Sequence, residues 1–261
     1  MAEVLIVRDE EAAGALAAGA IVDLIRAKPD AVLGLATGST PLTTYRALAR
    51  RIHDEGLDVG RVRGFALDEY VGLSADHPES YRSVIAREVV GPLSLTPEHV
   101  RVPSGHPATI RTTGSDYEAA IDAAGGVDLQ ILGIGRTGHI GFNEPGSSLA
   151  SLTRVKTLTE STRRDNARFF ESSDDVPMHC ITQGIGTILR ARHLVLLAFG
   201  HAKAGAVAAA VEGAVSTRSP GSAIQLHPHA TVIIDEAAAS RLEFIDYYRH
   251  AWSNKPEWQG I

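Results

Sequence analysis

Residues 133–146, which read GIGRTGHIGFNEPG, combine several glycines with side chains that can exchange protons. His139 is the one side chain in this segment that titrates near neutral pH, and Glu144 is close enough in sequence to hydrogen-bond it. The segment also begins with the pattern G-x-G-x-x-G, which can mark a turn that binds a dinucleotide. Its residues therefore suit either a cofactor loop or an acid–base loop.

The residues that follow the glycines distinguish these two interpretations. A dinucleotide turn needs a helix to begin at the glycines, so that the first amides of the helix face the pyrophosphate. Gly141 and Pro145 follow within eight residues of Gly138 and oppose a helix there. The acidic ribose ligand expected about twenty residues later is also missing. We interpret the segment as an acid–base loop and expect no cofactor; a His139–Glu144 pair that only holds the loop together is the alternative.

The segment TGSTP, residues 37–41, is a candidate phosphate site. It joins an apolar run to a helical pattern, and Pro41 suits the first position of a helix that Thr40 would cap. The N–H groups at the start of a helix attract anions, and the helix dipole adds to this attraction. An ordinary capped helix start would have the same sequence, so the turn alone does not decide the question.

Two cations are placed to complete such a phosphate site. Lys203 follows an apolar run that ends at Gly200, and Arg168 lies in a polar stretch, residues 153–177. Taken alone, each is better explained as a surface charge. The candidate phosphate ligands are Gly38, Ser39, Thr40, Arg168 and Lys203.

Asp68 and Glu69 end a further apolar run, residues 62–69. Neighbouring residues of a strand face opposite sides, so one of the two carboxylates is expected to face a cleft, where it would suit proton abstraction beside a carbonyl group. A metal site would need more Asp or His ligands at short spacing; these are absent here, and no metal is expected. Cys180, the one cysteine, is interpreted as a small buried residue rather than a nucleophile.

The elements that must position these residues alternate along the chain. Apolar runs at 31–38, 62–69, 127–135, 193–200 and 230–236 are predicted strands, and helical patterns occupy 9–27, 41–56, 77–90, 114–124 and 201–213. This alternation predicts an open, mostly parallel α/β sheet of the Rossmann-like type with helices on both faces. Ligands of such sheets bind beyond the carboxyl ends of the strands, which is where the candidate residues lie.

Composition limits the class of protein. The chain has 261 residues, 44% hydrophobic and 21% charged, and a formal net charge of −6. We expect one domain over residues 1–261, no nucleic-acid partner, and a locally positive site for any phosphorylated ligand. The amino-terminal segment lacks a signal-peptide pattern, and the longest apolar run, Gly14–Ile25, is too short to cross a bilayer, so a cytoplasmic protein without a membrane partner is expected. The stretch 153–177 is either a mobile lid or a solvated connection.

Motifs spread over residues 30–236 carry a family resemblance. In order, they are TGSTP, LDEYVGL with DHPESY, GIGxxGHIGFNEPGSSL, RVKTLT, RFF and GHAK. Together they resemble glucosamine-6-phosphate deaminase, also called glucosamine-6-phosphate isomerase. The resemblance implies a hydrolase acting on a C–N bond in amino-sugar catabolism, which converts glucosamine 6-phosphate and water to fructose 6-phosphate and ammonia without a cofactor or an active-site metal.

The resemblance also implies roles for individual residues. Asp68 would move a proton between C2 and C1 of the sugar through an enolamine, His139 would open the pyranose ring, and Glu144 would orient His139. The candidate phosphate ligands named above would hold the 6-phosphate. Aldose–ketose conversion needs a ring opener, a carbon base and a phosphate anchor, and these residues supply all three.

One position departs from the commoner family pattern. Many members carry an acidic residue directly before the Gly-His pair, where this chain has Thr137, so the way in which His139 is held is open. Some members are hexamers that N-acetylglucosamine 6-phosphate activates at a subunit interface. Ser147, Arg154 and Lys156 match that activator site, whereas its carboxyl-terminal tyrosine does not align: Arg249 falls nearest, beside Tyr248. A homo-oligomer and an activator site are therefore expectations from the resemblance alone.

Two other functions compete with this one. 6-Phosphogluconolactonase shares the fold type, but it would be expected to carry a Thr-Ala-Ser-Leu-like run after Gly-His in place of IGFNEP. A sugar-phosphate sensor that binds without turnover is favoured by Thr137 alone. The presence together of Asp68, His139 and Glu144 favours an enzyme.

Overall fold

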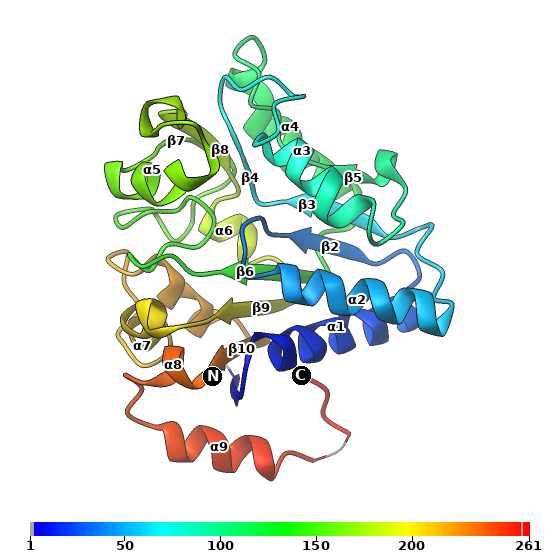
Figure 1. The fold of residues 1–261 in the computed structure, drawn as a ribbon, viewed down its shortest axis with the longest axis vertical. Helices are drawn as coiled ribbons and strands as arrows, with labels where there is room; N and C mark the ends of the chain where they lie inside the picture. The colour runs from blue at the N-terminus through cyan, green and yellow to red at the C-terminus, as the bar shows by residue number, and fades with distance from the viewer. Residues whose placement is uncertain (1–2, 257) are drawn as a thin grey trace.

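The computed structural model describes residues 3–256 and 258–261, and a seven-stranded parallel sheet lies at its centre (Figure 1). The strand order is β1-β10-β9-β6-β2-β3-β5. The strands are β1 (Glu3–Val7), β2 (Val32–Leu35), β3 (Arg63–Ala66), β5 (Val100–Arg101), β6 (Leu129–Gly133), β9 (His193–Ala198) and β10 (Ala230–Asp235). All pairings within this sheet are parallel, so the predicted fold class is confirmed.

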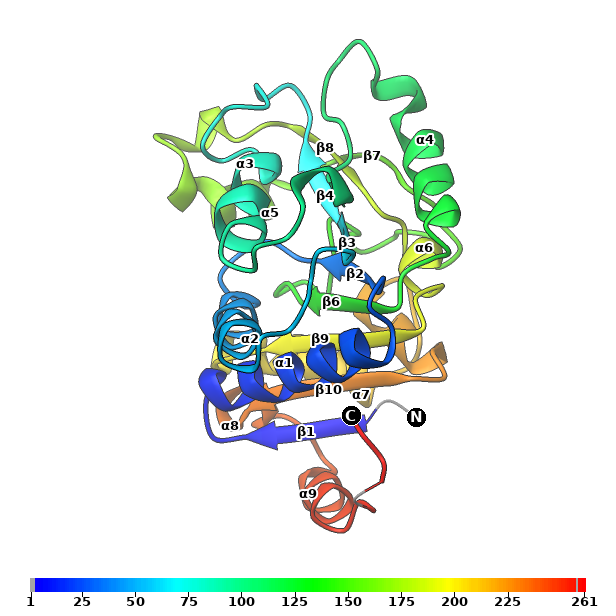
Figure 2. The same ribbon diagram turned by 90° about the vertical axis from the view of Figure 1, so that its right-hand side faces the viewer.

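Helices cover both faces of the sheet. The helices α1 and α2 pack against each other on one face, and α7 lies on the other (Figure 2). The helices are α1 (Glu10–Ala27), α2 (Leu42–Glu55), α3 (Tyr81–Ile85), α4 (Ile110–Ala123), α5 (Glu160–Asn166), α6 (Ile185–Ile188), α7 (Ala204–Val211), α8 (Glu236–Ala239) and α9 (Ile245–Ser253). Asp9 caps α1 by accepting a hydrogen bond from the N–H of Ala12.

A second, three-stranded antiparallel sheet lies above the first. It has the order β4-β8-β7, with β4 (Asp68–Tyr70), β8 (His179–Thr182) and β7 (Arg154–Thr157) (Figure 2). The single strand predicted over residues 62–69 is therefore wrong, because the chain leaves the main sheet at Leu67. The carbonyl group of Leu67 accepts a hydrogen bond from Gln183 N–H at 2.8 Å, and Asp68 then pairs with Thr182.

Three predicted segments differ from the observed elements. The helix expected over 77–90 begins at Tyr81, where Ser80 caps it, and continues as a π-helix at Ala86–Val90. The helix α4 starts four residues before the predicted 114. Part of the polar stretch 153–177 is the strand β7, which is fixed by its pairing with β8, and the rest consists of α5 and short 3-10 turns.

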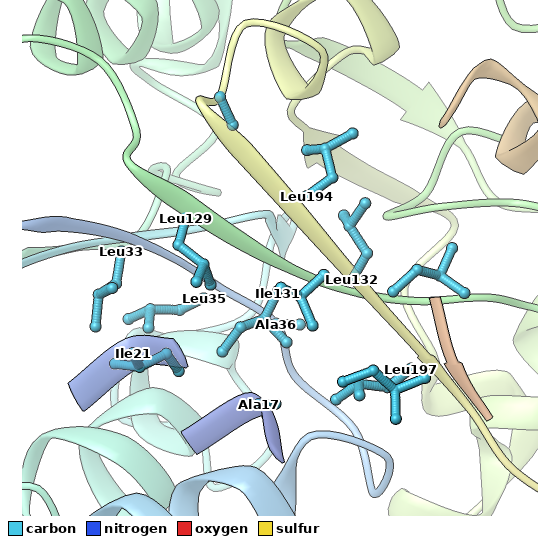
Figure 3. Close-up of a cluster of buried hydrophobic side chains, with 14 of the residues drawn as sticks. Ala17, Ile21, Leu33, Leu35, Ala36, Leu129, Ile131, Leu132, Leu194 and Leu197 are labelled. Atoms are coloured by element: carbon cyan, nitrogen blue, oxygen red, sulfur yellow. The ribbon is translucent and has the colours of Figure 1, made fainter. Parts of the chain in front are cut away.

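The core explains why the central strands are apolar on both faces. Leu33 and Leu35 of β2, Ile131 of β6 and Leu197 of β9 are buried between helices on each side, and Ile21 of α1 packs against the same cluster (Figure 3). Strands of a parallel sheet that are covered on both faces read as continuous apolar runs. Burial of each such side chain contributes roughly 1.5–3 kcal/mol, so the core holds the carboxyl ends of the strands in place for the site.

Candidate active site

A cavity of about 650 Å³ lies at the carboxyl ends of the central strands. It is lined by the segments that follow β2, β3, β6 and β9, together with residues of α3 and α5. Parallel α/β sheets place their ligand sites at this edge. The structure thus brings the candidate segments of the sequence to one cavity.

The glycines of the loop after β6 allow the imidazole ring of His139 to lie close to the backbone. No helix lies between β6 and β7 in the described chain, which agrees with the interpretation against a dinucleotide turn. A Cβ atom on Gly135 would lie 2.1 Å from the His139 ring, so only glycine allows the ring to approach the backbone there. Gly138 has φ +82°, a conformation that favours glycine.

His139 is held through its Nδ1 atom by two neighbours. Thr137 Oγ1 lies 2.9 Å from Nδ1, and Glu144 Oε1 lies 3.2 Å from it. The Thr137 hydroxyl donates its one proton to Glu144 Oε2 at 2.9 Å, so it can only accept from Nδ1. The proton of a neutral His139 ring therefore lies on Nδ1, and Nε2, which has no partner among the described residues, keeps its lone pair.

Glu144 is a buried carboxylate that remains ionised. Burial raises its pKa, but hydrogen bonds with His139, Thr162 and Thr137 and the charge of His139 outweigh burial and lower the pKa to about 2. Thr162 donates a short hydrogen bond to Oε1 from α5. Glu144 does not line the cavity; it lies behind His139, where it can orient the ring and stabilise its protonated form.

Asp68 is the second titratable group of the cavity. Its side chain is 5% exposed and lines the cavity, and no donor in the described chain contacts its carboxylate. Burial and the charge of Glu69 raise the pKa of Asp68 to about 8. A carboxylate with a raised pKa and free oxygens is suited to exchange protons with a bound molecule.

Glu69 faces the other way, as the alternation along a strand predicts. Its carboxylate accepts hydrogen bonds from the N–H groups of Tyr70, Tyr81 and Arg82, so it joins β4 to the start of α3. These bonds occupy the carboxylate and leave Asp68 as the member of the pair that faces the cavity. In the residues that the structure describes, no group of three or more His, Cys, Asp or Glu side chains is arranged to hold a metal ion.

The turn after β2 forms another part of the cavity wall. Gly38, Ser39 and Thr40 all line it, and their N–H groups have no partner within residues 3–256 and 258–261. The prediction that Thr40 caps α2 is wrong: the cap position is Pro41, without a side-chain hydrogen bond, and the helix starts at Leu42. The hydroxyl of Thr40 therefore remains available to a ligand.

Lys203 and Arg168 reach the same cavity from separate segments. Lys203 is half-buried and donates a hydrogen bond to Ile134 O at 2.7 Å; Arg168 lies over the ring of Phe169 at 4.7 Å. Arg136, for which the sequence predicted no role, also lines the cavity. Its position in the loop after β6, three residues before His139, is the signal that could have identified it.

The three residues that match an activator site lie outside this cavity. Arg154 Nη1 donates to Asn143 Oδ1 at 2.7 Å, and Lys156 lies on β7. Ser147 is buried, and its hydroxyl has no hydrogen-bond partner among the described residues. Tyr248 donates to Glu212, and Arg249 pairs with Glu236. Within the described chain, neither of these carboxyl-terminal residues contacts the other three.

Cys180 is fully buried on β8. Burial, and secondarily the charge of Asp68, raise the pKa of its thiol far above the usual range. Its thiol contacts the carbonyl of Lys156. This environment agrees with a buried structural residue and opposes a nucleophile.

The fold and the cavity define a class of α/β protein in which acid–base groups and cations meet at the carboxyl ends of parallel strands. Within that class, this chain belongs to the family of glucosamine-6-phosphate isomerases and 6-phosphogluconolactonases, whose family model matches residues 9–233. Both names in that description concern phosphorylated sugars.

Individual relatives narrow the comparison. The chain is 61% identical to a glucosamine-6-phosphate deaminase of Bifidobacterium longum (strain DJO10A), over the whole of both chains, and 59% identical to that of Streptomyces coelicolor, over 99% of this chain and all of the other. Among solved structures, a monomeric glucosamine-6-phosphate deaminase superposes with a TM-score of 0.89 at 44% identity, covering 92% of this chain and 99% of that one. The 6-phosphogluconolactonase of Trypanosoma brucei, with a TM-score of 0.73 at 19% identity, shares the fold.

Proposed function

We propose that this protein is a glucosamine-6-phosphate deaminase, which converts glucosamine 6-phosphate and water to fructose 6-phosphate and ammonia. The observation that carries the proposal is the meeting of Asp68 and His139 in one cavity with the unpaired amides of the turn after β2. Relatives of this name at about 60% identity over the full chain support it. The isomerisation requires only proton transfers on a sugar that is held in place.

The reaction begins with ring opening by His139. Its Nε2 atom accepts the proton of the anomeric hydroxyl and returns a proton to the ring oxygen, while Glu144 and Thr137 hold Nδ1–H. The ionised Glu144 stabilises the positive charge that develops on the imidazole ring. This step yields the open-chain aldehyde form of the sugar.

Asp68 performs the step at carbon. Its carboxylate removes the proton from C2 to give an enolamine and returns that proton to C1, while one proton of the C2 ammonium group passes to O1, which produces a protonated ketimine. Water adds to the ketimine, and ammonia leaves to give the ketone. The cations and turn amides hold the 6-phosphate away from the reacting carbons, so that its binding energy orients C1 and C2 toward Asp68.

An assay of ammonia release tests the proposal. Wild-type protein should release ammonia from glucosamine 6-phosphate, and His139→Asn should reduce the rate by about 10²–10⁴-fold, the usual contribution of a positioned acid–base group. 6-Phosphogluconolactone is the control substrate, and its hydrolysis without ammonia release from the amino sugar would favour the lactonase reaction instead. Binding of glucosamine 6-phosphate without turnover would favour a sensor.

The proposal includes two features of the surroundings. The segment after β7, from α5 to Phe170, supplies side chains to the cavity wall and is proposed to act as its lid; the pairing of β7 with β8 restricts such movement to residues after Thr157. Ser147, Arg154 and Lys156 are proposed to bind N-acetylglucosamine 6-phosphate as an activator, supported by the unpaired, buried hydroxyl of Ser147. A sigmoidal rate curve that this compound makes hyperbolic, together with a homo-oligomer in sedimentation, would support that site.

A further inference from the structure

Arg136, Arg168 and Lys203 are cationic side chains that line the cavity, although the proposed mechanism uses only Arg168 and Lys203. Arg168 and Lys203 come from the segment after α5 and the turn after β9, and Arg136 comes from the loop that carries His139. Burial lowers the pKa of Lys203 most, and the charges of Arg136 and Arg168 lower it further. All three side chains line the same cavity, so their charges can act on one ligand bound there.

Arg136 is held by a carboxylate that lines the same cavity. Its Nη2 atom forms an ion pair with Oδ1 of Asp165, on α5. The two side chains are 57% and 41% exposed, and ion pairs this exposed to water are weak. The guanidinium group has five N–H donors in a planar fork, and the pair with Asp165 leaves donors free.

We propose that Arg136 is a third phosphate-binding cation of this site and that Asp165 holds it in place until the phosphate group of the ligand replaces the carboxylate. This inference rests on the proposed function for the identity of the ligand. A phosphate dianion offers three acceptor oxygens and more charge than a carboxylate, and arginine binds phosphate in a two-pronged geometry. A sugar without the phosphate cannot make this exchange, so the Arg136–Asp165 pair favours phosphorylated ligands.

The position of Arg136 in the chain connects this exchange to the acid–base group. Gly135, directly before it, lies under the imidazole ring of His139, and Thr137, directly after it, hydrogen-bonds Nδ1 of that ring. Substitutions at 136 should therefore preserve length and polarity, so that the loop keeps its shape. Arg136→Gln and Arg136→Lys meet this requirement: the first removes the charge, and the second keeps the charge without the fork.

Inorganic phosphate is the probe, and its dissociation constant is measured by titration calorimetry at constant ionic strength. Arg136→Gln should weaken phosphate binding about tenfold or more, as expected for a lost charge-assisted hydrogen bond, and Arg136→Lys should restore part of the loss. Asp165→Asn should tighten binding by about two- to fivefold, because it releases Arg136. In the double variant Arg136→Gln/Asp165→Asn, the effect of the second substitution should disappear.

Arg164→Gln is the matched control: Arg164 is an exposed arginine of α5 outside the cavity, and its removal should change the constant by less than about twofold. The inference is overturned if wild-type protein does not bind phosphate, if Arg136→Gln binds it as well as wild type, or if Asp165→Asn tightens binding equally with and without Arg136. The measurement requires no turnover. A protein that shows the expected phosphate pattern but releases no ammonia would refute the proposed function and leave this inference in place.

Discussion

Two buried carboxylates of this site have opposite protonation tendencies because their neighbours differ. Glu144 accepts hydrogen bonds from His139, Thr137 and Thr162, and its pKa falls to about 2. Asp68 accepts no hydrogen bond from the described residues, and burial, followed by the charge of Glu69, raises its pKa to about 8. Sites that divide acid and base work between two groups separate their pKa values in this manner. One carboxylate is thereby suited to hold the imidazole, and the other to exchange a proton with carbon.

Asp68→Asn should separate activity from stability. We expect kcat to fall by about 10²–10⁴-fold, with phosphate-ligand binding within a few-fold of wild type. Because the pKa of Asp68 is raised on folding, ionisation of this group opposes folding as pH rises from about 4 to 8, and removing it should raise Tm at pH 8 by about 2–4 °C for each kcal/mol gained. If Asp68→Asn still incorporates solvent deuterium at C1 at the wild-type rate, Asp68 is not the carbon base. If the Tm of the variant is unchanged, the pKa of Asp68 is not raised on folding.

The sequence left open how Thr137 holds His139. In the structure, Thr137 bridges His139 and Glu144. Its hydroxyl accepts from His139 Nδ1 and donates to Glu144, so a neutral side chain orients the ring without adding charge. A carboxylate at this position would favour the protonated imidazole, because opposite charges attract. Residue type and spacing could indicate that Thr137 lies near His139, but not the direction of each hydrogen bond.

In Thr137→Asp, the limb of the kcat/KM profile that reports His139 should therefore move to higher pH than in wild type. Full pH–rate profiles of both proteins measure this shift, and Thr137→Ser, which keeps the hydroxyl, serves as the control with an unmoved limb. Identical profiles for Thr137→Asp and wild type would mean that residue 137 does not influence the imidazole during turnover.

At the scale of elements, local sequence patterns predicted the parallel sheet. They did not predict the antiparallel sheet β4-β8-β7, because it depends on pairing between segments distant in sequence. The apolar runs that became β2, β6, β9 and β10 are continuous, because both faces of these strands are buried. The strands β4, β7 and β8 are three or four residues long, and their pairing joins segments distant in sequence. Such short strands carry no periodic signal, so the division of residues 62–69 between two sheets could not be read from the sequence.

The segment that contains α5 and the turn after β9 meet at the proposed phosphate group, so substitutions in either element should have the same effect. Lys203→Ala and Arg168→Ala each remove a charge-assisted contact worth about 1.5–3 kcal/mol. We expect the affinity for glucosamine 6-phosphate to fall about ten- to a hundredfold. Arg164→Ala is the matched control, since this exposed side chain lies outside the cavity. Equal use of glucosamine and its 6-phosphate by wild-type protein would argue against any phosphate anchor.

At the scale of the whole molecule, a cluster of His193, His229 and Thr231, the amino-end cluster, lies one strand length away from the cavity. The cavity lies at the carboxyl ends of the main sheet, whereas His193 begins β9 and His229 directly precedes β10 at the amino ends. The two imidazole rings stack at 3.7 Å, and His193 Nε2 lies 2.9 Å from Thr231 Oγ1. The amino-end cluster is therefore placed to affect stability rather than the chemistry of the cavity.

No helix of residues 3–256 or 258–261 is long and apolar enough to cross a membrane.

His193 should make the stability of the whole protein depend on pH below neutrality. Burial, and then the charges of His229, His227 and Lys255, lower the pKa of His193 to about 3 from its ordinary value of 6.5. Between these two values the unfolded chain binds more protons than the folded one, so the free energy of unfolding falls as pH decreases from about 6.5 toward 3.

We expect His193→Phe, which keeps a ring to stack on His229, to lose less stability between pH 7 and pH 5 than wild type, by about 2 kcal/mol. Urea unfolding at both pH values measures the difference. His99→Phe, at an exposed histidine, is the control and should keep the wild-type dependence. Equal losses in His193→Phe and wild type would show that His193 does not enter the folded state as a neutral group, and that the acid sensitivity of the fold arises elsewhere.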